Sequence, residues 1–277
     1  MSTPAADKLK VVMTCSVFEP GYRGGGPIRS VAHIVDNAPG DVDLTLIASD
    51  RDLGAESPYP GLSGRWIRRG AAKVYYLNAN SVSQWYSLWK SIRQSPPDLL
   101  YVNSLFDPRF SVAPIIATRL GLISTRTVLI APRGELSPGA LGIKATKKKY
   151  FLRIWASLIK GLNVGWHASA ELEAQHIRSS FPGAAVAINQ DQSGLPEEPL
   201  EPRQSLDSHA RFVFVSRISR MKNLEAVLVA LRNMEQGVEF DIYGPIEDQD
   251  YWKECQSLAE GLPVNVRVAY RGELTPD

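Results

Sequence analysis

Three neighbouring glycines, Gly24, Gly25 and Gly26, follow the first apolar run of the chain and precede a run with helical spacing. Glycine lets a backbone come close to a ligand, and Pro27 suits the first position of a helix because no backbone donor is lost there. Free N–H groups at a helix start favour an anion such as a diphosphate. A flexible turn would also explain the glycines. We favour an anion-binding loop, because α/β sheets bind ligands at this end of their strands.

A second group of candidate residues is cationic. Arg217, Arg220 and Lys222 follow a short apolar run and open a further helical pattern. Cations gathered between a strand end and a helix start suit a diphosphate leaving group. On the residues alone, a solvated basic turn explains them equally well.

A third candidate is the long loop over residues 130–141, which follows an apolar run and contains Arg133 and Glu135. Function usually lies on loops at this edge of a parallel sheet. His167 ends another such run, although a lone histidine is more often structural. The four histidines form no zinc pattern, the Asp-x-Asp pairs are expected by chance among 29 acids, and the two cysteines are far apart in the sequence. We therefore expect no metal site.

Short β-branched or aromatic runs alternate along the chain with longer runs of helical spacing, which predicts a parallel sheet covered by helices. The predicted strands are 10–15, 43–48, 73–77, 99–103, 127–131, 163–168, 185–189, 212–215, 239–243 and 266–270. The first predicted helix begins near Ile28, and the others cover 83–94, 109–121, 144–160, 169–180, 223–234 and 249–262. Ser169 is the predicted N-cap of the helix over 169–180.

The alternation is interrupted by a proline-rich and acidic stretch, which predicts two domains. We expect a first Rossmann-like domain over 1–195, a linker over 196–209 and a partial second domain over 210–277. The second block has room for about three strands, whereas a doubly wound nucleotide-binding domain has about six.

The predicted helix 144–160 combines a lysine cluster with Phe151, Trp155 and Leu158. This pattern fits either a peripheral contact with an anionic membrane or the solvated face of a core helix. No stretch approaches the ~18 apolar residues of a spanning helix. The formal net charge of +2 does not suggest nucleic acid as a partner. We expect a cytoplasmic protein, with peripheral contact on the inner membrane face as a hypothesis.

Familiar nucleotide and hydrolase motifs are absent from the sequence. Gly21 and Gly26 have the spacing of a P-loop, but Pro27 and Ile28 stand where Lys and Ser or Thr are required. A dinucleotide fingerprint would need glycine at Arg29, and no G-x-S-x-G elbow is present. A Rossmann-type oxidoreductase is therefore the weaker alternative.

Several stretches, taken in order along the chain, resemble motifs of the family 4 glycosyltransferases. They are the Gly24–Gly26 loop, the strand and turn over 98–106, the segment APRGELSPGAL over 131–141 with Lys147–Lys149, the segment WHASAELEA over 166–174, FVSRI with Lys222, and the looser DIYGP over 241–245.

The resemblance implies an α/β protein of the GT-B type, with two Rossmann-like domains and an incomplete second one. It further implies a hexosyltransferase that moves a sugar from a nucleotide-sugar donor, with retention, to a glycan or lipid-linked acceptor in polysaccharide or glycoconjugate synthesis. It assigns no cofactor or metal. The implied residues are Arg133 and Asn103 as catalytic, Arg217, Lys222, Gly24, Gly25 and Gly26 on the donor diphosphate, and Glu135 and His167 on the acceptor side.

The sequence also departs from the family pattern. Ser216 replaces a glycine, Pro132 and Arg133 stand where many members have a histidine, and the acidic E-x₇-E motif is expected beyond Asp277. We therefore expect little or no transfer by residues 1–277 alone, and an uncovered apolar face around Val227 and Leu231. A non-catalytic, nucleotide-binding remnant remains the main alternative.

Overall fold

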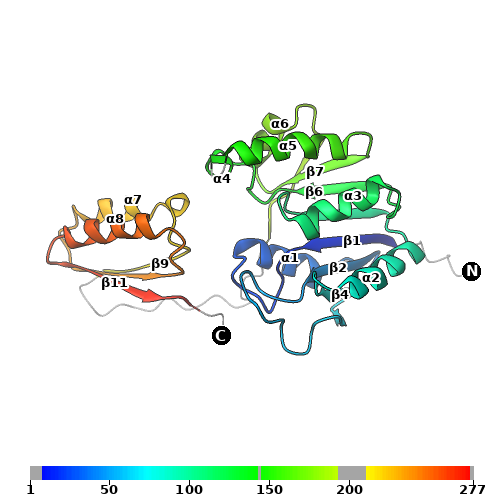
Figure 1. Cartoon of the computed structure of the whole chain (residues 1–277). Coiled ribbons are helices and arrows are strands. Elements are labelled where there is room, and N and C mark those ends of the chain that lie inside the picture. Colours follow the sequence, from blue (N-terminus) through cyan, green and yellow to red (C-terminus); the bar gives the residue numbers. More distant parts are fainter. Residues whose placement is uncertain (1–7, 143–144, 193–209, 275–277) are drawn as a thin grey trace, which may run out of the picture. The chain divides into compact units, whose positions relative to one another are not determined.

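The computed structural model describes residues 8–142, 145–192 and 210–274, and the predicted linker 196–209 lies outside them (Figure 1). The chain divides into two compact units, Met1–Leu195 and Pro196–Asp277. Each unit is an α/β layer structure of the kind that the alternating pattern predicts.

An eight-stranded sheet forms the first unit, in the order β3-β4-β2-β1-β5-β6-β7-β8. Its strands are β1 (Leu9–Cys15), β2 (Val42–Ser49), β3 (Trp66–Arg69), β4 (Ala72–Leu77), β5 (Leu99–Asn103), β6 (Thr127–Ala131), β7 (Val164–Ala168) and β8 (Val186–Ile188). All of the pairings are parallel except that of β3, which runs antiparallel to β4. The predicted strands are present, with ends that differ by at most two residues.

Helices cover both faces of this sheet (Figure 1). They are α1 (Gly26–Asp36), α2 (Val82–Gln94), the π-helical turn η1 (Pro108–Val112), α3 (Ala113–Arg119), α4 (Pro138–Gly142), α5 (Ala145–Ile159) and α6 (Glu171–Ser180). The buried residues of α1 join one core cluster, and those of α2, α3, α5 and α6 join another. Right-handed crossovers account for this, because the chain moves one way from β1 to β2 and the other way from β4 to β8.

Two helix starts differ from the prediction. Helix α1 begins at Gly26, so Pro27 occupies the second helical position. Ala170, not Ser169, is the residue before α6, and no side chain accepts from the first amides of this helix. The Ser169 amide and hydroxyl instead both donate to the Glu173 carboxylate at the first turn.

The second unit is a three-stranded parallel sheet in the order β11-β10-β9, with β9 (Ala210–Val215), β10 (Val238–Tyr243) and β11 (Val266–Gly272). Its helices are the short η2 (Arg220–Lys222), α7 (Leu224–Leu231) and α8 (Gln249–Glu260). The expected uncovered face is wrong for Leu231, which is buried against the sheet. The expectation holds for Val227, which is exposed on α7, and further exposed apolar side chains lie on the edge strand β9, at Phe212, Val213 and Val215.

Candidate active site

A pocket of about 190 Å³ lies at the carboxyl ends of β1, β5 and β6 in the first unit. It is lined by the glycine-loop residues Gly24, Pro27 and Ile28, by the end of β1, and by Asn103, Ser104, Arg133 and Glu135. Four predicted site residues, from three segments that are far apart in the sequence, therefore line one pocket.

Hydrogen bonds from neighbouring residues fix the backbone of the glycine loop. The Asp52 carboxylate accepts hydrogen bonds from the amides of Tyr22 at 3.1 Å and Arg23 at 3.3 Å. Gly25 has a φ of 72°, where a side chain would be strained, and its amide donates to the Tyr22 carbonyl at 3.1 Å. Of the three glycine amides, those of Gly24 and Gly26 have no acceptor among the described residues. Two donors, not three, remain for an anion.

Arg133 lies at the centre of a polar network and is almost completely buried, with 6% of its side chain exposed. Its Nε and Nη2 donate to Asn103 Oδ1 at 3.0 and 2.8 Å, Nη2 donates to the Tyr101 hydroxyl at 3.1 Å, and Nη1 donates to Asp191. A guanidinium has five N–H donors, so these bonds leave one Nη1 donor for a ligand. The backbone of Arg133 is left-handed, with a φ of 54°, which turns the chain sharply after β6.

His167 is part of the same network, and both of its ring nitrogens are engaged. Nε2 lies 2.8 Å from the carbonyl of Asn189, which can only accept, so Nε2 carries a proton. Nδ1 then accepts from the Tyr101 hydroxyl at 2.5 Å, while the Tyr101 oxygen accepts from Arg133. Burial raises the pKa of Tyr101 to about 12, which keeps this hydroxyl protonated, although Arg133 opposes the shift. His167 therefore orients the Tyr101 hydroxyl, which in turn contacts Arg133. Because both ring nitrogens have partners, neither is free to contact an acceptor in the role that we expected from the sequence.

Two glutamates hold the loops that carry Asn103 and Arg133. Glu135 accepts from the Ser104 hydroxyl at 2.9 Å and the Leu105 amide at 2.6 Å, which fixes the turn after β5. Burial raises the pKa of Glu135, and these hydrogen bonds oppose the rise. Glu173 is buried and accepts from the Gly134 amide at 2.7 Å as well as from Ser169. The loop after β6 is therefore anchored to the turn after β5 through Glu135 and to the start of α6 through Glu173.

The segment that follows β8 crosses this edge of the sheet. Besides the contacts of Asn189 and Asp191, the Gln192 side-chain oxygen lies 3.0 Å from Nε2 of His33 on α1. The segment is therefore tied to β7, to the loop after β6 and to α1.

Cys15 lines the pocket but is not suited to nucleophilic chemistry. Burial raises the pKa of its thiol to about 12, even though Arg133 acts in the opposite direction. The thiol is therefore neutral at physiological pH, and the neutral form is a poor nucleophile.

The predicted diphosphate ligands of the second unit lie on one turn after β9. Arg217 donates to Glu247 at 2.9 Å and remains about half exposed. Lys222 ends η2, is exposed, and takes part in no ion pair within the described part of the chain. Lys222 is therefore the more available cation, because Arg217 must give up Glu247 to bind an anion.

Gly244 allows this turn to form. Its φ is 136°, and a Cβ on it would lie 1.9 Å from the carbonyl oxygen of Ser216. The Ser216 amide donates to the Tyr243 carbonyl at 3.0 Å, and Ile218 pairs with Ile246. The loops after β9 and β10 therefore approach so closely that only glycine fits.

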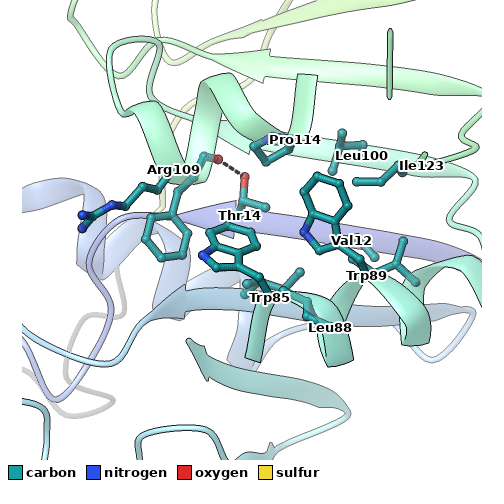
Figure 2. A pocket seen from close by; sticks show the side chains of 12 residues that line it. Val12, Thr14, Trp85, Leu88, Trp89, Leu100, Arg109, Pro114 and Ile123 are labelled. Atoms are coloured by element: carbon teal, nitrogen blue, oxygen red, sulfur yellow. Dashed lines mark hydrogen bonds between the residues drawn. The ribbon is translucent and has the colours of Figure 1, made fainter. Parts of the chain in front are cut away.

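A separate apolar cavity of about 20 Å³ lies between α2, α3 and the sheet (Figure 2). Trp85, Trp89 and Phe110 line it, and the Thr14 hydroxyl beside it donates to the Phe110 carbonyl at 2.6 Å. Its volume is that of about one water molecule, so it cannot hold a nucleotide. We regard it as a packing void of the core.

Within the described ranges, no group of three or more His, Cys, Asp or Glu side chains is placed to hold a metal ion. None of the helices described is both long and apolar enough to cross a membrane.

Solved structures share this architecture, although no family model matches the sequence and no curated protein matches it. HepE from Anabaena, solved with UDP and glucose, superposes with a TM-score of 0.62 at 16% identity, over 96% of this chain and 70% of that chain. The fold is GT-B. Two further solved structures are similar. The lipopolysaccharide outer core galactosyltransferase WaaB superposes with a TM-score of 0.54 at 14% identity, over 96% of this chain and 68% of that chain. Starch synthase IV from Arabidopsis thaliana, solved with ADP and acarbose, superposes with a TM-score of 0.57 at 12% identity, over 95% of this chain and 74% of that chain.

Each of the two units has a sheet of mainly parallel strands packed against helices, as the Rossmann-like domains of a GT-B fold do. The three described strands of the second unit are fewer than the about six of a doubly wound nucleotide-binding domain, in line with the expected partial second domain.

Proposed function

We propose that this chain belongs to a glycosyltransferase that uses a nucleotide-sugar donor. One observation carries the proposal: a pocket in a GT-B fold unites the glycine loop with Asn103, Arg133 and Glu135. HepE, one of the solved proteins with this fold, was solved in complex with UDP and glucose. We further propose a family 4, retaining hexosyltransferase that acts on a glycan or lipid-linked acceptor in polysaccharide or glycoconjugate synthesis.

The proposed chemistry is electrostatic stabilisation of the leaving nucleoside diphosphate. Lys222, Arg217 and the free amides of Gly24 and Gly26 would neutralise the charge that develops on it. Asn103 and the remaining Nη1 donor of Arg133 would contact the reacting sugars from the pocket. Glu135 and His167 would hold these groups in place on the acceptor side.

The cytoplasm, with peripheral contact on the inner membrane face, is the proposed location. A lipid-linked acceptor would be reached there. We propose that no metal or cofactor is required for the transfer itself, because protein cations and amides supply the charge.

Calorimetry with nucleoside diphosphates and with NAD(P) tests the donor class. We expect Lys222→Ala to weaken diphosphate binding by ~1–3 kcal/mol, and Arg217→Ala by less, because the wild-type protein must first break the Arg217–Glu247 pair. Arg232→Ala is a matched control, since Arg232 is exposed at the end of α7 away from the turn.

Sugar release from a panel of nucleotide sugars, with a mixed acceptor pool, tests the reaction. NAD(P) binding, or unchanged diphosphate affinity in both turn variants, would refute the assignment. Because little or no transfer is expected from residues 1–277 alone, diphosphate binding without turnover fits both this proposal and a non-catalytic, nucleotide-binding protein, whereas sugar release would exclude the latter.

A further inference from the structure

The charges of this protein are strongly segregated along its sequence. Residues 108–170 contain ten Lys and Arg but one acid, Glu135, which gives a net charge of +9. The rest of the chain contains 21 Lys and Arg against 28 acids. The modest overall charge of +2 therefore conceals a basic region in the first unit.

This region includes the helices α3 and α5, whose described residues contain no acid. The two helices pack side by side on one face of the sheet, and the guanidinium of Arg119 at the end of α3 approaches Gly161 just beyond α5. At about 1.5 Å per residue, the 15 residues of α5 extend for about 22 Å. The basic residues are thus displayed along an extended helical surface.

Part of the cationic set serves the fold. Lys148 is half-buried, donates to the Ala140 carbonyl at 2.6 Å and lies 4.9 Å from the centre of the Phe106 ring. Arg133 belongs to the pocket, and Arg126 pairs with Asp98 at 3.3 Å. These three cations have partners of their own.

The remaining described cations of α3 and α5, together with Lys160 just after α5, are exposed and belong to no ion pair within residues 8–142, 145–192 and 210–274. They are Arg119, Lys147, Lys149, Arg153 and Lys160, and we call them with their apolar neighbours the α3–α5 surface. Unpaired cations on one face create a positive potential that attracts anions over about a Debye length.

Exposed apolar side chains lie among these cations. Leu120 is 68% exposed and Tyr150 67%, and Ile154 is 45% exposed. They differ from the residues that the sequence pattern suggested, because Trp155 is fully buried and Phe151 and Leu158 pack against the core. The exposed positions Tyr150 and Ile154 are four residues apart, so they share the outer stripe of α5 with Lys147.

We propose that the α3–α5 surface docks on an anionic lipid bilayer. The five cations would contact lipid phosphates, while Leu120, Tyr150 and Ile154 enter the interfacial layer. This surface would make the membrane contact that the proposed function includes, and its binding to vesicles can be measured without the sugar donor or the acceptor.

The apolar side chains favour a membrane over a nucleic acid. A phosphate backbone would be recognised by the cations alone, and an exposed leucine or isoleucine gains nothing from it. At a bilayer interface the same side chains leave water, at about 25 cal/mol per Å² of apolar area. Of these two kinds of partner, the lipid surface is therefore the one on which charge and apolar area act together.

Vesicle sedimentation of the full chain tests the proposal. Vesicles of phosphatidylcholine are compared with vesicles that also contain phosphatidylglycerol, at low and high salt. We expect binding to the anionic vesicles that salt weakens, and little binding to the neutral ones. The triple variant Lys147→Ser, Lys149→Ser, Arg153→Ser should bind the anionic vesicles about a hundredfold more weakly than the wild type, because each lost cation lowers the affinity by about fivefold.

A control triple variant, Arg65→Ser, Arg68→Ser, Arg232→Ser, removes the same charge from exposed positions outside the α3–α5 surface and should bind nearly as well as the wild type. The double variant Tyr150→Ser, Ile154→Ser should weaken binding but retain its salt dependence. All of the substituted side chains are exposed, so the melting temperatures should stay close to that of the wild type.

Three outcomes would overturn the proposal: equal binding to neutral and anionic vesicles, equal effects of the two triple variants, or binding of an oligonucleotide without binding of anionic vesicles. Sugar transfer by a chain that ignores vesicles would refute this surface alone. Vesicle binding without any nucleotide-sugar binding would instead refute the proposed function and leave the surface intact.

Discussion

Glu173→Gln tests whether a buried carboxylate holds the loop that carries Arg133. The Glu173 carboxylate accepts three hydrogen bonds, from the Gly134 amide at 2.7 Å, the Ser169 amide at 2.8 Å and the Ser169 hydroxyl at 2.7 Å. Glutamine has nearly the same shape but only one accepting oxygen. It can therefore serve either Gly134 or Ser169, and the other amide loses its acceptor.

The expected loss follows from these contacts. The Ser169 hydroxyl can rotate to accept from the new amide group, so the net cost is one bond to a charged acceptor and one unsatisfied N–H that is at most partly buried. Such changes cost ~2–4 kcal/mol in total. For a unit of this size, each kcal/mol lowers the melting temperature by about 2–4 °C, so we expect a fall of about 4–16 °C.

Differential scanning calorimetry measures this fall, and Glu171→Gln is the matched control. Glu171 lies in the same helical turn, but its side chain is 62% exposed and contacts Arg178 at 3.3 Å. A surface pair of this kind contributes little, so the control should melt within about 2 °C of the wild type. If Glu173→Gln and Glu171→Gln melt at the same temperature, the anchoring role of Glu173 is wrong.

Three further predictions concern other parts of the chain. Gly244→Ala should destabilise the second unit by more than ~3 kcal/mol in urea unfolding, because its Cβ would overlap the Ser216 carbonyl, whereas Gly261→Ala should change little. Val12→Ile should add up to ~0.8 kcal/mol of stability by filling the 20 Å³ void, and a lower melting temperature would show that the void cannot accept a methylene. The pKa of Glu135 is raised in the folded state, so the folded protein binds this proton more tightly than the unfolded chain, and the free energy of unfolding falls as pH rises above the usual glutamate range. Glu135→Gln should reduce this fall. The same pH profile of unfolding in the variant and the wild type would contradict this prediction.

The parallel strands could be predicted because their apolar runs are continuous and their ends are marked by loop residues. Strand β3 was missed because it has four residues, two of them arginine, and its antiparallel pairing depends on the turn at Gly70. The single helix expected over 109–121 is divided into η1 and α3. Asp107 caps the start of η1, where its carboxylate accepts from the amides of Arg109 and Phe110.

The candidate site could be predicted in part. The strand-to-helix order placed Gly24, Asn103 and Arg133 at one edge of the sheet, and the structure brings them to one pocket. The partners that orient them could not be found in the same way. Asp52 belongs to an Asp-x-Asp pair that we ascribed to chance, and Asp191 follows a short edge strand with no motif around it. Their roles depend on tertiary contacts across 30 and 58 residues of sequence, which no local pattern encodes.

The two sheets differ in how their edges meet the solvent. The first sheet ends on one side in the four-residue antiparallel β3 and on the other in the three-residue β8. Short edges of this kind offer little backbone for another chain to extend. Strand β9 offers six residues, and Phe212, Val213 and Val215 beside its outer edge are exposed. During refolding at high concentration, copies of this protein should therefore associate through β9, and a lysine at position 213 should raise the yield of soluble chain.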